Sequence, residues 1–136
     1  MMAVILKVLD VGTVRLSSCT LHGARHAQGL FVDCPGSSAH ATKSNFFQNS
    51  NGDKAGYGGT LTAVACTSSG NADTGFHAEG QGSVVNLTDC TSDKDGQGCC
   101  AELHAKLCAT RVEVTSRVAS GFTSAGGEMV LQDCSA

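Results

Sequence analysis

Two glutamates and two histidines recur in the second half of the chain at a spacing that could support acid–base chemistry. Glu79 and Glu102 are 23 residues apart, and His77 and His104 each lie two residues from one of them. Two neighbouring carboxylates raise the pKa of one of the pair, and such a pair can act in general acid–base catalysis. Asp33 occupies the equivalent position earlier in the chain, so we predict a candidate ligand-binding face formed by Asp33, His77, Glu79, Glu102 and His104.

An ordinary solvated face is the alternative interpretation of these residues. The sequence places no Lys or Arg clearly over Glu79 and Glu102, and the loops around them are short. A catalytic role for this face is therefore one of two interpretations of the sequence. Its candidate catalytic residues are Glu79, Glu102, His77 and His104.

Eight cysteines offer a second kind of chemistry. Cys66 and Cys90 occupy equivalent positions, where parallel in-register side chains keep their Cβ atoms farther apart than a disulfide prefers. This favours buried reduced thiols, with a disulfide as the alternative. Such a stack presents its sulfurs from one side only, so we predict no metal site there, and no motif indicates a cofactor. Cys100 and Cys108 are expected to be exposed.

A glycine recurs every 23 residues and indicates the framework that carries these side chains. We interpret it as a corner where the chain turns tightly because no Cβ is present. The members of this glycine column are Gly29, Gly52, Gly75, Gly98 and Gly121.

Two columns of apolar residues follow the same repeat, with mostly polar residues between them. This alternation predicts short strands with one buried face. The first apolar column comprises Leu16, Ala41, Ala63, Leu87, Ala109 and Leu131. The second comprises Val14, Ala39, Leu61, Val85, Leu107 and Met129. A bend is expected shortly after each strand, at Ser18, Lys43, Ala65, Asp89, Arg111 and Asp133.

These patterns predict an all-β fold, a right-handed parallel β-helix solenoid of about five to six coils with 22 to 25 residues each. One domain is expected over residues 1–136, with residues 1–12 as an N-terminal cap or first strand and 13–136 as the repeat coils. The repeat "SVVNLTDCTSDKDGQG" and the junction "NSNGDKAGYGGTLTA" resemble the right-handed parallel β-helix, pectin-lyase-like family. That resemblance implies a fold shared by lyases, hydrolases, epimerases, adhesins and scaffolds, whose enzymes bind polysaccharide on an outward strand face.

Composition excludes several classes of function. The formal net charge is -3 and the nine Lys and Arg are dispersed, which argues against nucleic-acid binding. No apolar run reaches membrane-spanning length, and residues 1–12 lack the pattern of a secretory signal. An intracellular location, cytoplasmic or organellar, is therefore expected.

The last coil lacks a polar cap, so either another protein covers it, the chain self-associates there, or the sequence is part of a longer chain. We expect this coil to be a contact surface. Its predicted interface residues are Met129, Val130, Leu131, Gln132, Asp133 and Cys134. We therefore expect a non-catalytic β-helix scaffold or protein-interaction module within a larger assembly. The alternative is a carbohydrate-binding or polysaccharide-active β-helix that uses the Glu79–Glu102 face.

Overall fold

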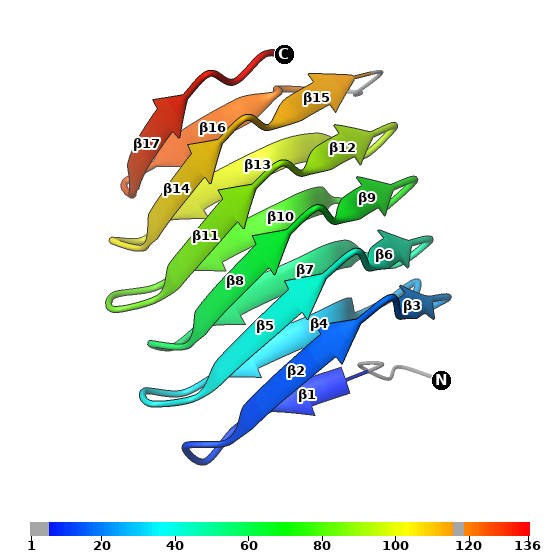
Figure 1. Ribbon diagram of the computed structural model, residues 1–136. Helices are drawn as coiled ribbons and strands as arrows, with labels where there is room; N and C mark the ends of the chain where they lie inside the picture. Colours follow the sequence, from blue (N-terminus) through cyan, green and yellow to red (C-terminus); the bar gives the residue numbers. More distant parts are fainter. Residues whose placement is uncertain (1–5, 116–118) are drawn as a thin grey trace.

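The computed structural model describes residues 6–115 and 119–136, which form three parallel β-sheets stacked as a β-solenoid of about five turns (Figure 1). The all-β prediction is confirmed. The chain climbs from β1 at one end of the stack to β17 at the other. No helix in the described part of the chain is long and apolar enough to cross a membrane.

Each complete turn contributes one strand to each of the three sheets, and the last, partial turn adds a strand to two of them. Sheet A consists of β1 (Leu6–Val8), β4 (Gln28–Asp33), β7 (Asn51–Gly56), β10 (Thr74–Glu79), β13 (Gln97–Glu102) and β16 (Phe122–Ala125). Sheet B consists of β2 (Thr13–Ser17), β5 (Ser38–Thr42), β8 (Thr60–Val64), β11 (Val84–Thr88), β14 (Lys106–Thr110) and β17 (Glu128–Gln132). Sheet C consists of β3 (Thr20–His22), β6 (Asn45–Phe47), β9 (Thr67–Ser69), β12 (Thr91–Asp93) and β15 (Glu113–Thr115).

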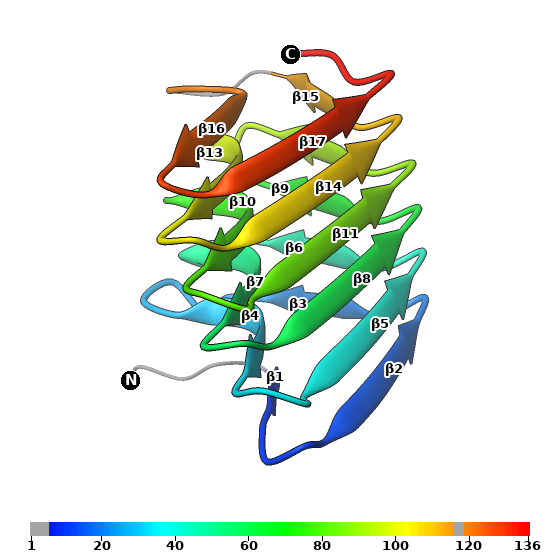
Figure 2. The same ribbon diagram turned by 90° about the vertical axis from the view of Figure 1, so that its left-hand side faces the viewer.

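The strands of sheet B lie side by side from β2 to β17, and their register confirms the two apolar columns (Figure 2). Leu87 pairs with Ala63 on one side and with Ala109 on the other, and all three are buried. Leu16 and Leu131, on the two outermost turns, occupy the same file and are less buried. The alternation of apolar and polar residues therefore specifies which face of each strand enters the core.

The predicted bend between sheets B and C is also confirmed. All six residues of the bend column adopt the left-handed backbone region, with φ between 49° and 55°. This corner returns the next position to the interior, where Ser44, Cys66, Cys90 and Val112 are buried. Cys66 and Cys90 are free thiols, whose Sγ atoms donate hydrogen bonds to the carbonyl oxygens of Ala41 and Ala63 respectively.

The interpretation of the glycine column as a tight corner is wrong. Gly29, Gly52, Gly75 and Gly98 lie within strands of sheet A, and their backbones are outside the left-handed region. A Cβ added at any of them would lie within 2.8 Å of the carbonyl oxygen of the next glycine in the column. Glycine recurs because adjacent turns approach each other too closely for a side chain.

A ladder of buried polar side chains runs beside the glycine column. The Oδ1 atoms of Asn49, Asn71 and Asp95 accept hydrogen bonds, each of 2.9 Å, from the backbone N–H groups of Ala24, Asn49 and Asn71 respectively. Each side chain thus satisfies a buried donor of the preceding turn. Burial raises the pKa of Asp95. The ladder and the glycines together fix the distance between turns at this edge.

Candidate functional site

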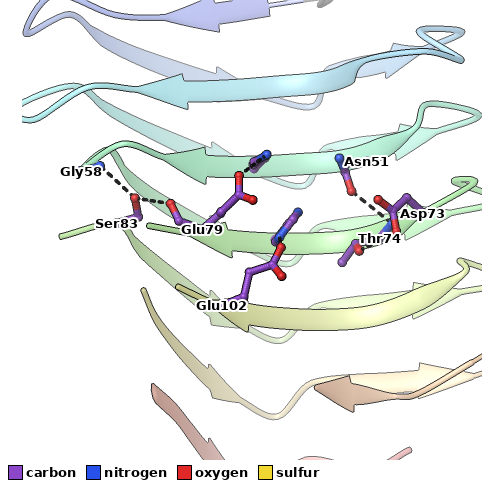
Figure 3. A network of polar contacts seen from close by, with 9 residues as sticks. Asn51, Gly58, Asp73, Thr74, Glu79, Ser83 and Glu102 are labelled. Carbon is purple, nitrogen blue, oxygen red and sulfur yellow. Dashed lines mark hydrogen bonds and ion pairs between the residues drawn. The ribbon is translucent and has the colours of Figure 1, made fainter. Parts of the chain in front are cut away.

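The candidate site lies on the outward face of sheet A. Phe76 and Ala78 point into the core, so the alternation along β10 turns His77 and Glu79 outward. The parallel register aligns His77 with Cys100, and Glu79 with Glu102, on the next strand. Figure 3 shows Glu79 and Glu102 on adjacent strands of this face. The prediction that the two glutamates are neighbours is therefore confirmed.

Glu79 is held by a lysine that sequence analysis did not place over this face. The Nζ atom of Lys54 lies 2.7 Å from Oε2 of Glu79, and the side chain of Lys54 is 13% exposed. This hydrogen bond, together with the lysine charge, lowers the pKa of Glu79 below its usual value. Glu79 is therefore ionised at neutral pH and is a poor general acid.

Glu102 pairs with the histidine of the preceding turn rather than with Glu79. The Nε2 atom of His77 lies 2.6 Å from Oε1 of Glu102. His77 is only 6% exposed, and its Nδ1 atom is buried without a hydrogen-bond partner among the described residues. The two carboxylates thus have separate partners and do not share a proton.

Cys100 is buried, at 5% exposure, which corrects the expectation that it is an exposed thiol. Burial, and secondarily the charge of Glu102, raises its pKa to about 11. The side chain is therefore a neutral thiol at pH 7, which does not favour a cysteine nucleophile. One ligand-type atom from each of His77, Cys100 and Glu102 lies within 4.8 Å of the other two.

These three side chains border a small polar hollow in sheet A. Its volume is about 270 Å³, and it is lined by Asp73, Thr74, His77, Gln97, Cys100, Glu102, Thr123 and Ala125. Figure 3 shows Asp73 and Thr74 near the start of β10, whereas Glu79 lies at its far end. The Oγ1 atom of Thr123, which is in register with Cys100, is buried without a described partner. Two of the lining residues, His77 and Thr123, thus have a buried polar atom with no described hydrogen-bond partner.

Comparison with protein-family models, curated proteins and solved structures finds no match. The parallel β-solenoid is shown by the structure alone, and the resemblance to the pectin-lyase-like family is not confirmed. The chemistry of the site must accordingly be inferred from its own geometry.

Asp33 and His104, the other predicted members of this face, lie outside the group of three. Asp33 lies two turns before Glu79 in the same file, with Gly56 between them. Its Oδ2 atom lies 3.4 Å from Nζ of Lys7. His104 is exposed in the turn after β13, with a left-handed φ of 68°.

Sequence analysis missed Lys54 and Cys100 as members of the site. Both lie 23 residues from His77, on either side of it, so the period of the glycine column locates them in the same outward file. Applying that period to every outward position, and not only to the carboxylates, would have identified them.

Proposed function

We propose that this protein is a non-catalytic β-solenoid scaffold that binds another protein chain at the turn containing β17. The interior of the stack supports a rigid framework, because each apolar file packs in register through successive turns. The outward carboxylates support a non-catalytic role, because Glu79 and Glu102 are each engaged by a basic partner.

The observation that carries the proposal is the exposure of Leu131. Its counterparts Ala63, Leu87 and Ala109 are at most 1% exposed, whereas Leu131 is 44% exposed and its neighbour Val130 is 47% exposed. In the described chain β17 pairs only with β14, so its other edge has unpaired backbone groups. An apolar edge strand of this kind favours addition of a strand from another chain. A second copy of this protein is the simplest source of that strand.

Sedimentation velocity of the purified protein over a range of concentrations tests this proposal. We expect wild type to associate as its concentration rises, and Leu131→Lys to stay monomeric, because a charged side chain in this file opposes burial. Thr62→Lys is the matched control, because it adds the same charge at an outward position of β8, and it should associate like wild type. Monomeric wild type, or equal behaviour of the two variants, would contradict the proposal.

The alternative is a carbohydrate-binding or polysaccharide-active protein, supported by the polar hollow beside Glu102 and by the resemblance to the pectin-lyase-like family. A turnover assay on acidic and neutral polysaccharides separates the two functions. Turnover that disappears in Glu102→Gln at unchanged thermal stability would favour the alternative.

A further inference from the structure

The group His77, Cys100 and Glu102 combines three metal-ligating side chains outside the proposed protein-binding turn. They come from two adjacent strands, with Cys100 and Glu102 two residues apart on the same face of β13 and His77 in register with Cys100 on β10. Both strands are hydrogen-bonded within one sheet, so the spacing of the three side chains is fixed by the framework.

The burial of two of the three residues distinguishes this group from a chance surface cluster. His77 and Cys100 are at most 6% exposed, and 30% of the Glu102 side chain is open to solvent. A carboxylate can only accept a hydrogen bond, so Nε2 of His77 carries the proton toward Glu102. The other ring nitrogen, Nδ1, is buried and has no hydrogen-bond partner among the described residues. The imidazole is therefore incompletely satisfied, and it lies beside a thiol and a carboxylate.

We propose that His77, Cys100 and Glu102 bind one Zn²⁺ ion through an imidazole nitrogen, a thiolate and a carboxylate oxygen, with water in the fourth position. The mixture of sulfur, nitrogen and oxygen ligands suits Zn²⁺ and disfavours Ca²⁺ and Mg²⁺, which prefer oxygen ligands alone. The hollow beside the group has room for the water. The hydroxyl of Thr123, which has no hydrogen-bond partner within residues 6–115 and 119–136, borders the same hollow.

The charges around the site match a divalent cation. The thiolate and the carboxylate together supply two negative charges, and the proton of the Cys100 thiol leaves to solvent when the metal binds. Lys54, the closest cation in the file of His77, is already neutralised by Glu79. Among the described residues that line the site, none carries an unpaired positive charge that would oppose the ion.

Metal binding requires only a small rearrangement. In tetrahedral coordination the nitrogen and oxygen ligands would be about 3.4 Å apart, given zinc–ligand distances of about 2.1 Å. The Nε2 and Oε1 atoms are now 2.6 Å apart. If these two atoms are the ligands, the direct hydrogen bond must open by less than 1 Å, which the partly exposed Glu102 side chain can accommodate. The proton of Nε2 must then leave this nitrogen, and Nδ1, which has no hydrogen-bond partner among the described residues, can hold it.

Titration of the reduced, chelator-treated 136-residue protein with Co²⁺, followed by Zn²⁺ competition, tests this proposal. We expect one Co²⁺ per chain, with a thiolate-to-cobalt charge-transfer band in the near-ultraviolet and the intense visible bands of tetrahedral Co²⁺. Stoichiometric Zn²⁺ should remove both signals.

Variants assign the ligands. Loss of an outer-shell partner typically weakens metal binding by roughly 10–100-fold, and loss of a direct ligand should cost at least as much. Cys100→Ser should therefore abolish the charge-transfer band and weaken Zn²⁺ binding by at least about 100-fold, and Glu102→Gln should weaken it by about tenfold or more. Cys108→Ser is the matched control, because Cys108 lies on sheet B, and it should bind like wild type. Circular dichroism reports whether each variant is folded. If Cys100→Ser does not fold, Glu102→Gln still tests the site, because the side chain of Glu102 is partly exposed and its replacement is better tolerated. Absence of stoichiometric Co²⁺ binding in wild type, or equal binding by folded Cys100→Ser or Glu102→Gln, would overturn the proposal.

Discussion

Gly52→Ala is expected to lower the free energy of unfolding by about 3 kcal/mol, the upper range for overpacking a well-packed interior. Gly52 lies in β7, and a Cβ there would lie 2.5 Å from the carbonyl oxygen of Gly75 and 2.5 Å from Oγ of Ser68. The carbonyl belongs to the backbone of the next turn, so relief of this contact requires the two turns to separate. Urea denaturation followed by circular dichroism measures the loss.

Gly70→Ala is the matched control for this substitution. No atom lies within 4 Å of a Cβ built on Gly70, although its φ of 61° is left-handed. The free energy of unfolding of the control should therefore fall by only about 1 kcal/mol, the cost of placing a residue with a Cβ in a left-handed backbone conformation. Equal losses in the two variants would contradict the view that close approach between turns selects glycine.

Asp53→Val is expected to raise the free energy of unfolding at pH 7 by about 2 kcal/mol, the scale of an unpaired buried polar group. Asp53 is fully buried in sheet A, in register with Leu30 and Phe76, and neither of its carboxylate oxygens has a described hydrogen-bond partner. Valine replaces the carboxyl with apolar atoms of similar volume. Urea denaturation of wild type and variant at pH 7 measures the difference, and a less stable variant would contradict this account.

The pH dependence of stability provides a second test of Asp53. Burial, followed by the charges of Cys66 and Asp95, raises its pKa well above the usual value. The unfolded chain therefore loses this proton first, near pH 4, and stability falls as pH rises from there toward the folded pKa. Asp53→Asn keeps the size and polarity of the side chain but removes its titratable proton. The free energy of unfolding of this variant should therefore decrease less steeply as pH rises. The rest of the decrease in stability should persist in this variant, because the pKa of Asp95 is also raised. A pH profile that is identical in Asp53→Asn and wild type would contradict the assignment.

The stacking of turns could be predicted from sequence because it depends on local alternation and a fixed period. Apolar residues at alternate positions determine the inward face of each strand, and polar residues determine the bends, so Leu87, Ala63 and Asp89 are where the repeat places them. The role of the glycines could not be predicted in the same way. It depends on the distance between turns, and a glycine at a corner and a glycine at a close approach look the same in one dimension.

The outward site was predicted only in part. The repeat aligned Glu79 with Glu102, but their partners Lys54 and His77 come from neighbouring turns, and contacts between turns depend on side-chain direction. The buried Asp53 was missed because the other members of its inward column, such as Leu30 and Phe76, are apolar. A charged residue in such a column gives no local signal of its burial.

Methyl-resolved nuclear Overhauser spectroscopy tests the stacking of turns most directly. Because parallel strands lie about 4.8 Å apart, the methyl groups of Leu87 should give cross-peaks to those of Ala63 and Ala109, which are 24 and 22 residues away in sequence. They should give none to Leu16, which lies three turns away in the same file. Assigned spectra that lack the cross-peaks from Leu87 to Ala63 and Ala109 would contradict the fold, and with it both the scaffold and the zinc site.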